Sequence, residues 1–73
     1  MKGSKFVICI DNSEYPVSLE KLKIYEALPD SDAEKTKQIR VIDESGQDYL
    51  YPASFFIDAN LSKETRDAVA KVA

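Results

Sequence analysis

The sequence contains no histidine and only one cysteine, Cys9. Histidine is the usual general base near neutral pH and the commonest metal ligand, so its absence excludes a Ser-His or Cys-His nucleophile within this chain. A single cysteine excludes both an internal disulfide and a zinc site built from several cysteines. Cys9 lies inside an apolar run, where a free cysteine usually behaves as a small buried hydrophobe, and we therefore expect it in the core.

Glycine and long apolar runs are also scarce. Gly3 and Gly46 are the only glycines, too few for a phosphate-binding loop of the Walker or dinucleotide type. The longest apolar run, residues 6–10, is far shorter than the roughly 20 residues that a membrane-spanning helix needs. The N-terminus lacks the apolar region of a signal peptide. We therefore expect a cytoplasmic protein without a membrane partner.

A basic surplus is absent as well, because the net charge is −3. Nucleic acids and anionic membranes attract basic surfaces, so this charge disfavours a nucleic-acid partner. The acidic stretch 26–34 is followed at once by basic residues, and we interpret it as a solvated loop. Three further acids, Asp43, Glu44 and Asp48, lie close together in the chain but lack the spacing of a calcium-binding loop. We therefore expect a plain turn there, with no metal and no cofactor.

The clearest pattern that is present is a hairpin. Two runs rich in β-branched and aromatic residues, 39–42 and 49–51, flank a turn that contains Gly46. A three-residue loop that ends at Gly46, in the left-handed conformation, pairs Val41 with Tyr49. A four-residue loop would place two aspartates opposite each other, and facing like charges are unfavourable. We therefore predict the three-residue loop.

Three other segments have strand character. Residues 5–10 are apolar on both alternating faces, which predicts a strand covered on both sides. Residues 22–28 predict a strand that Pro29 ends, although their composition also suits a helix. Residues 52–55 predict a turn with a short 3₁₀ segment, and residues 55–58 the last strand.

Two segments have helical character. Ser31 and Glu34 have the spacing of a capping box, which predicts one helical turn within residues 29–37. Residues 61–73 predict a C-terminal helix with Ser62 as its N-cap. Its apolar stripe consists mainly of small residues, namely Leu61, Thr65, Ala68, Val69 and Val72. The whole chain, residues 1–73, is then one small, mostly β domain with a tail at residues 1–4.

Residues 51–56, YPASFF, resemble the end of an SH3 domain, where a Pro-x-x-aromatic turn precedes the last strand. A longer pattern, which runs roughly from residue 6 to residue 57, resembles a family of small bacterial proteins without an assigned function. The resemblance implies a five-stranded SH3-like barrel with a short C-terminal α-helix, and it implies no activity. The chain has no tryptophan, and only Pro52 and Phe55 match the peptide groove of SH3 domains.

These observations favour a non-catalytic protein-interaction module with an unknown protein partner. Tyrosine suits interfaces because it is large, rigid and carries a polar end. We expect the partner to bind an aromatic patch near the Tyr51–Pro52 turn, formed by Tyr15, Arg40, Tyr51, Pro52 and Phe55.

Two alternatives stay open at this point. One is a nucleic-acid-binding SH3-like barrel that acts in transcription or translation, for which the basic candidates are Lys21, Lys23, Lys35, Lys37 and Arg40. The other is a homodimer, because exposed strand edges invite pairing between chains. We expect no enzyme activity from a chain that lacks histidine and is too short to form a deep cleft.

Overall fold

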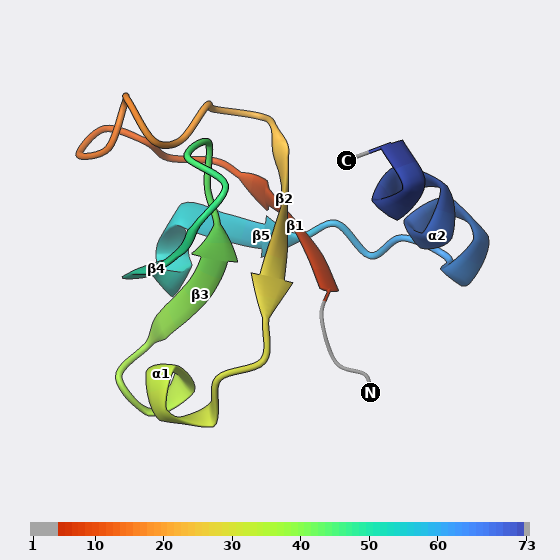
Figure 1. The fold of residues 1–73 in the computed structure, drawn as a ribbon. Coiled ribbons are helices and arrows are strands. Elements are labelled where there is room, and N and C mark those ends of the chain that lie inside the picture. The colour runs from red at the N-terminus through yellow and green to blue at the C-terminus, as the bar shows by residue number, and fades with distance from the viewer. Residues whose placement is uncertain (1–4, 73) are drawn as a thin grey trace.

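Five antiparallel strands form one sheet that curls into a half-barrel in the computed structural model (Figure 1). The structure describes residues 5–72, and it describes side chains up to residue 69. The sheet order is β4-β3-β2-β1-β5, so β4 and β5 are its edges. This confirms the predicted fold class, mostly β with five strands and a short C-terminal helix, whereas the resemblance to SH3 domains stays a prediction. The predicted tail at residues 1–4 lies outside the described residues. The strands are β1 (Lys5–Cys9), β2 (Ile24–Leu28), β3 (Gln38–Ile42), β4 (Asp48–Pro52) and β5 (Phe56–Asp58).

The β3–β4 hairpin has the predicted register, with Val41 opposite Tyr49. The Gly46 N–H donates to the carbonyl of Asp43 at 2.9 Å, and the Asp43 N–H donates to the carbonyl of Gln47 at 3.1 Å. These two bonds define a β-bulge whose first residue, Gly46, is left-handed, with a φ of 83°. Glycine adopts this conformation at little cost, so it fixes the loop as predicted.

A second bulge of the same kind joins β1 to β2. The Leu22 N–H donates to the carbonyl of Cys9 at 2.7 Å, and the Cys9 N–H donates to the carbonyl of Lys23 at 3.0 Å. Leu22 takes the position that Gly46 holds in the hairpin, with a φ of 69°. The strand predicted for residues 22–28 was wrong at its start and begins at Ile24, because a left-handed residue cannot continue the ladder.

Two short helical turns precede β3 and β5. The first, α1 (Ser31–Lys35), confirms the predicted turn but not its cap. The N-cap is Asp30, whose carboxylate accepts the Ala33 N–H at 3.0 Å, so Ser31 lies within the helix and the predicted capping box is wrong. The second, η1 (Ala53–Phe55), is the predicted 3₁₀ segment.

The core lies between the curled sheet and the long β1–β2 loop. Cys9 is fully buried, as predicted. The sequence of the loop predicts Val17 and Leu19 as its apolar anchors. Leu19 is buried, which confirms the prediction for it, but Val17 is 93% exposed and the prediction for it is wrong. The N–H groups of Ser18 and Leu19 both donate to the carbonyl of Tyr15, and this tight turn leaves Val17 on its outer side. The core comprises Val7, Cys9, Leu19, Tyr25, Ala27, Val41, Tyr51, Phe55 and Phe56.

The C-terminal helix, α2 (Lys63–Val72), projects to one side of the sheet (Figure 1). The Ser62 hydroxyl accepts the Thr65 N–H at 3.2 Å, which confirms the predicted N-cap. None of the side chains described for α2 belongs to the core, and Val69 is half-buried. Within the described part of the chain, no helix is long and apolar enough to cross a membrane.

Candidate functional site

The structure brings together three of the five residues predicted to form the aromatic patch. The Tyr15 ring packs edge-on against Tyr51, with 4.9 Å between ring centroids, and lies 5.9 Å from Phe55. Tyr51 and Phe55 are only 3% and 7% exposed, so they belong to the core. Pro52 is half-buried. Of these four residues, only Tyr15 is more than a third exposed.

Arg40 does not join these aromatic residues. It lies opposite Leu50 in the β3–β4 ladder, whereas Tyr51 lies opposite Ile39, so Arg40 and Tyr51 project from different faces of the sheet. The guanidinium Nε donates to Asp30 at 2.8 Å, and Nη1 donates to Asp48 at 2.9 Å. These two carboxylates raise the pKa of Arg40. The role of Arg40 is therefore to tie α1 to the β3–β4 hairpin.

A buried carboxylate connects the hairpin to the β1–β2 loop. Asp43 is 6% exposed and accepts hydrogen bonds from the Tyr51 hydroxyl at 2.5 Å and from the Ser45 N–H at 2.9 Å. The Ser18 hydroxyl of the loop lies 3.0 Å from the same Tyr51 oxygen. Burial alone would raise the pKa of Asp43, but the hydrogen bonds from Ser45 and Tyr51 outweigh it and lower that pKa.

A second carboxylate makes a parallel connection. The Tyr25 hydroxyl donates to Glu44 at 2.6 Å and accepts the Glu20 N–H at 2.6 Å. Lys23 Nζ lies 2.7 Å from the same Glu44 oxygen. Hydrogen bonds from Lys23 and Tyr25 lower the pKa of Glu44, while burial and Glu44 together raise the pKa of Tyr25. Both acids next to the hairpin tip are thus bound within the fold, as expected for a structural turn.

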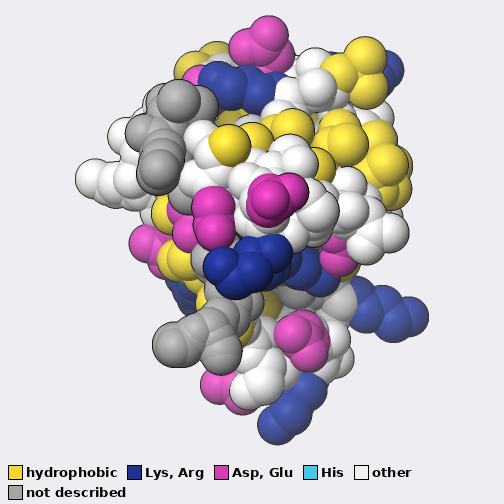
Figure 2. All heavy atoms as spheres, turned by 90° about the vertical axis from the view of Figure 1, so that its right-hand side faces the viewer, with side chains coloured by type: hydrophobic (Ala, Val, Ile, Leu, Met, Phe, Trp, Pro, Cys, Tyr) yellow, Lys and Arg dark blue, Asp and Glu magenta, His cyan; other side chains and the backbone are white. Residues whose placement is uncertain are grey.

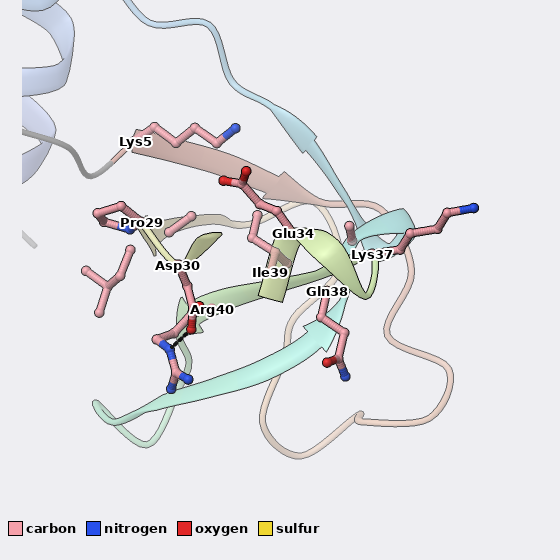
Figure 3. Close-up of a pocket in the computed structure, with 11 residues that line it drawn as sticks. Lys5, Pro29, Asp30, Glu34, Lys37, Gln38, Ile39 and Arg40 are labelled. Carbon is pink, nitrogen blue, oxygen red and sulfur yellow. Dashed lines mark hydrogen bonds and ion pairs between the residues drawn. The ribbon is translucent and has the colours of Figure 1, made fainter. Parts of the chain in front are cut away.

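A cleft of about 360 Å³ opens at the end of the half-barrel next to α1 (Figure 3). Asp30 at its rim is held by the Ala33 N–H and by Arg40, and both hydrogen bonds lower its pKa. Lys37 also lines the cleft, but its ammonium group points away from it (Figure 3). The cleft is lined by charged residues, of which Asp30 and Arg40 bond to each other, and by apolar ones. Its apolar lining consists of Ala27, Leu28, Pro29, Ile39 and Ala53.

An exposed aliphatic surface lies on the outer face of the sheet, away from the core. Ile8 of β1 is in direct register with Ile24 of β2 and with Ile57 of β5, so the three form one row across the strands. Ile10 follows Cys9 in the chain, and the Leu22 N–H donates to the carbonyl of Cys9, so both residues lie near the Cys9 end of this row. Figure 2 views the side toward which α2 projects and shows hydrophobic side chains gathered in its upper right part. We call Ile8, Ile10, Leu22, Ile24 and Ile57 the aliphatic surface.

The exposure of these side chains is high for aliphatic residues. Leu22 is 75% exposed and Ile57 is 50% exposed, while Ile10 and Ile24 are each exposed by more than a third. The prediction that both faces of the first strand are covered was wrong at Ile10, which lies beyond the end of β1. Full burial of one such side chain stabilises by about 1.5–3 kcal/mol, and much of that gain is unrealised here.

The sequence does contain a signal for the aliphatic surface. Isoleucine and leucine recur at Ile8, Ile10, Leu22 and Ile24, but without the strand register they are indistinguishable from core residues. Only the register places Ile8 and Ile24 side by side. Leu22 beside them is one of three non-glycine residues with a left-handed backbone in the described chain, together with Lys37 and Asn60. No family model, no curated protein and no solved structure matches this chain.

Proposed function

We propose that this chain is a non-catalytic protein-interaction module that binds its protein partner through the aliphatic surface. The observation that carries the proposal is Leu22, which combines an unfavourable backbone conformation with an exposed apolar side chain. A left-handed conformation costs an ordinary residue roughly 1–2 kcal/mol relative to a right-handed one. A strained residue that the core does not use is a reasonable marker of a binding site.

The chain itself provides a comparison for Leu22. Gly46 starts the same type of bulge in the β3–β4 hairpin, where it meets the conformational requirement without strain. A glycine at position 22 would serve the β1–β2 bulge equally well and would expose no apolar side chain. Since Leu22 contributes nothing to the core, its side chain is best explained by contact with another molecule.

The neighbours of Leu22 suit the same role. Ile24 and Ile57 flank Ile8 in register, so a partner can bury three branched side chains at once. The structure holds the Leu22 turn in place through Lys23 and Tyr25, which both bond to Glu44. A partner would therefore meet a surface that is already ordered, which reduces the entropy that binding has to overcome.

The charged residues favour this proposal over binding of nucleic acid. Arg40 is held by two carboxylates and Lys23 by one, so two of the five basic candidates already have acidic partners at less than 3 Å. Lys35 lies 3.9 Å from Asp32. Proteins bind nucleic acid largely through lysine and arginine side chains that neutralise phosphates, and side chains already paired with a carboxylate are less available for this. The cytoplasmic location expected from the sequence stays part of the proposal.

A glycine substitution tests the proposed function. Leu22→Gly removes the most exposed side chain of the aliphatic surface and relieves the backbone, so we expect the variant to stay folded, which circular dichroism checks. We expect proteins captured by the wild-type chain from cells that express it to be lost or strongly reduced with the variant, as measured by quantitative mass spectrometry. Tyr15→Ala serves as the matched control on the aromatic side and should retain them. Equal capture by Leu22→Gly and the wild type would refute the proposal.

Site-specific photo-crosslinking gives a second, independent measurement. A photoreactive residue at position 24 or 57 lies within the aliphatic surface, and one at position 35 lies on α1, outside it. We expect the same partner to crosslink from positions 24 and 57 and not from position 35. Crosslinks from position 35 alone would place the contact elsewhere on the molecule.

A further inference from the structure

We propose that the free edge of β4 pairs with β4 of a second copy of this chain, in an antiparallel arrangement around a two-fold axis at Tyr49. The pairing would join two five-stranded sheets into one of ten strands. It is independent of the aliphatic surface, which lies on β1, β2 and β5. Either proposal can therefore fail while the other holds.

The hydrogen-bonding pattern of the hairpin leaves the outer edge of β4 available. The Asp43–Gln47 pair is hydrogen-bonded, so by alternation Tyr49 and Tyr51 also direct their backbone groups toward β3. Asp48 and Leu50 then direct their N–H and C=O groups away from β3. β4 is the last strand of the sheet, and no hydrogen bond from any described residue reaches these four groups. An edge of this kind is a template for another strand.

The four free groups are self-complementary. When two copies of β4 run antiparallel with Tyr49 opposite Tyr49, Asp48 of each copy lies opposite Leu50 of the other. Each such pair exchanges two hydrogen bonds, which gives four bonds and uses all eight free groups. Pro52, which has no N–H, lies outside this register, so it weakens only longer pairings.

The side chains agree with the same register. Tyr49 is half exposed. In the proposed pairing, Tyr49 of one copy and Tyr49 of the other form a non-hydrogen-bonded pair, in which the two Cα atoms are about 4.5 Å apart and the two rings are neighbours. Aromatic pairs in such positions stabilise a ladder. Asp48 would lie beside Leu50 of the second copy, but Arg40 holds it at 2.9 Å and so offsets its charge. β4 itself carries no lysine, the residue that most often protects a strand edge.

The opposite edge of the sheet is less suited to pairing. β5 is three residues long, and the Phe56 N–H already donates to the carbonyl of Ala53. Asp58 ends that strand with a charged side chain next to Lys5. The β4 edge is therefore the one at which a second copy can add several hydrogen bonds.

The test combines sedimentation equilibrium with hydrogen exchange on the full chain. We expect a reversible dimer whose population grows as the chain concentration rises from about 10 μM to 1 mM, which corresponds to a micromolar to millimolar Kd. The backbone amides of Asp48 and Leu50 should gain protection as the concentration rises. Those of Tyr49 and Tyr51, which already bond to β3, should not change. The proposal is overturned if the chain stays monomeric at 1 mM, or if the amides of Asp48 and Leu50 show no gain in protection from hydrogen exchange as the dimer forms.

Two substitutions separate this edge from the rest of the surface. Tyr49→Lys places two like charges opposite each other at the axis and should weaken the dimer at least tenfold. Tyr49 lies outside the core, and circular dichroism checks that the variant folds. Ile57→Lys on β5 is the matched control and should leave the dimer unchanged. A dimer that weakens with Ile57→Lys and not with Tyr49→Lys would assign self-association to the aliphatic surface and overturn the β4 pairing.

Discussion

At the scale of single residues, Leu22 and Gly46 occupy equivalent positions in two β-bulges and should respond to substitution in opposite directions. Leu22→Gly should raise the free energy of unfolding by about 0.5–1 kcal/mol, because relief of the left-handed strain exceeds the added freedom of glycine in the unfolded chain. Gly46→Ala should lower it by about 1 kcal/mol. A Cβ at Gly46 meets no atom within 4 Å, so its cost comes from the backbone alone. Urea unfolding of both variants measures these changes.

The result for Leu22 bears directly on the proposed function. A gain in stability together with a loss of partner binding would show that position 22 serves recognition at the expense of the fold. If Leu22→Gly instead destabilised the chain, the leucine side chain would have a packing role that its 75% exposure does not suggest. The interpretation of Leu22 as a binding residue would then lose its basis.

The hydroxyl of Tyr51 offers a second test at this scale. Tyr51→Phe removes one donor from the buried carboxylate of Asp43 and should cost about 1–3 kcal/mol, because a buried charged acceptor then lacks a hydrogen bond. Tyr49→Phe is the matched control on the same strand. Its hydroxyl makes only an exposed 3.3 Å bond to Gln47, so its loss should change stability by less than about 0.5 kcal/mol. Similar unfolding midpoints for the two variants would contradict this assignment.

At the scale of elements, two tyrosine hydroxyls join the hairpin tip to the β1–β2 loop, because each bonds to a carboxylate of the tip and to a group of the loop. The two carboxylates make the fold sensitive to acid. The folded state lowers the pKa of Asp43 and of Glu44 below their ordinary values of 3.8 and 4.5. Stability from such groups is fully present above the ordinary pKa and is lost as pH falls through the lowered pKa. The urea midpoint should therefore be steady from pH 7 to pH 5 and fall below about pH 4.5.

Variants can assign this acid sensitivity to the hairpin. Asp43→Asn removes one titrating group, so its unfolding midpoint should be lower at pH 7 and should change less between pH 5 and pH 3 than that of the wild type. Asp11 and Asp30 also have lowered pKa values and contribute with the same sign, so part of the pH dependence should persist. An unchanged slope in Asp43→Asn would show that the buried carboxylate is not a source of the effect.

The elements also show where sequence patterns were sufficient. The β3–β4 hairpin was predicted in detail because Gly46, a residue suited to positive φ, lies at the required position. The β1–β2 bulge was missed because leucine occupies the equivalent position and looks like the start of a strand. The cap of α1 was assigned one residue too late, since Ser31 and Asp30 are both good caps. The sequence predicted a local structure correctly only where a single residue type was suited to the position.

The candidate site was harder to predict, for a physical reason. In a chain of 73 residues the core needs most of the aromatic side chains, so Tyr51 and Phe55 are buried although their residue types suit an interface. Arg40 projects from the other face of the sheet, a placement that depends on the register with Leu50. The aliphatic surface appears only when three strands are aligned. Residue type alone does not distinguish a core isoleucine from one that binds a partner.

At the scale of the whole molecule, the half-barrel should fold without its C-terminal helix. All members of the core cluster lie between Val7 and Phe56, and none of the α2 side chains that the structure describes joins them, although Phe6 is also buried. α2 is one short helix of ten residues, below the length at which an isolated helix is stable in water. We expect a chain that ends at Ser62 to lose less than about 1 kcal/mol of stability, as measured by urea unfolding. Its dispersion of amide NMR signals should match that of the full chain. A loss of cooperative unfolding in the truncated chain would instead make α2 a structural part of the domain.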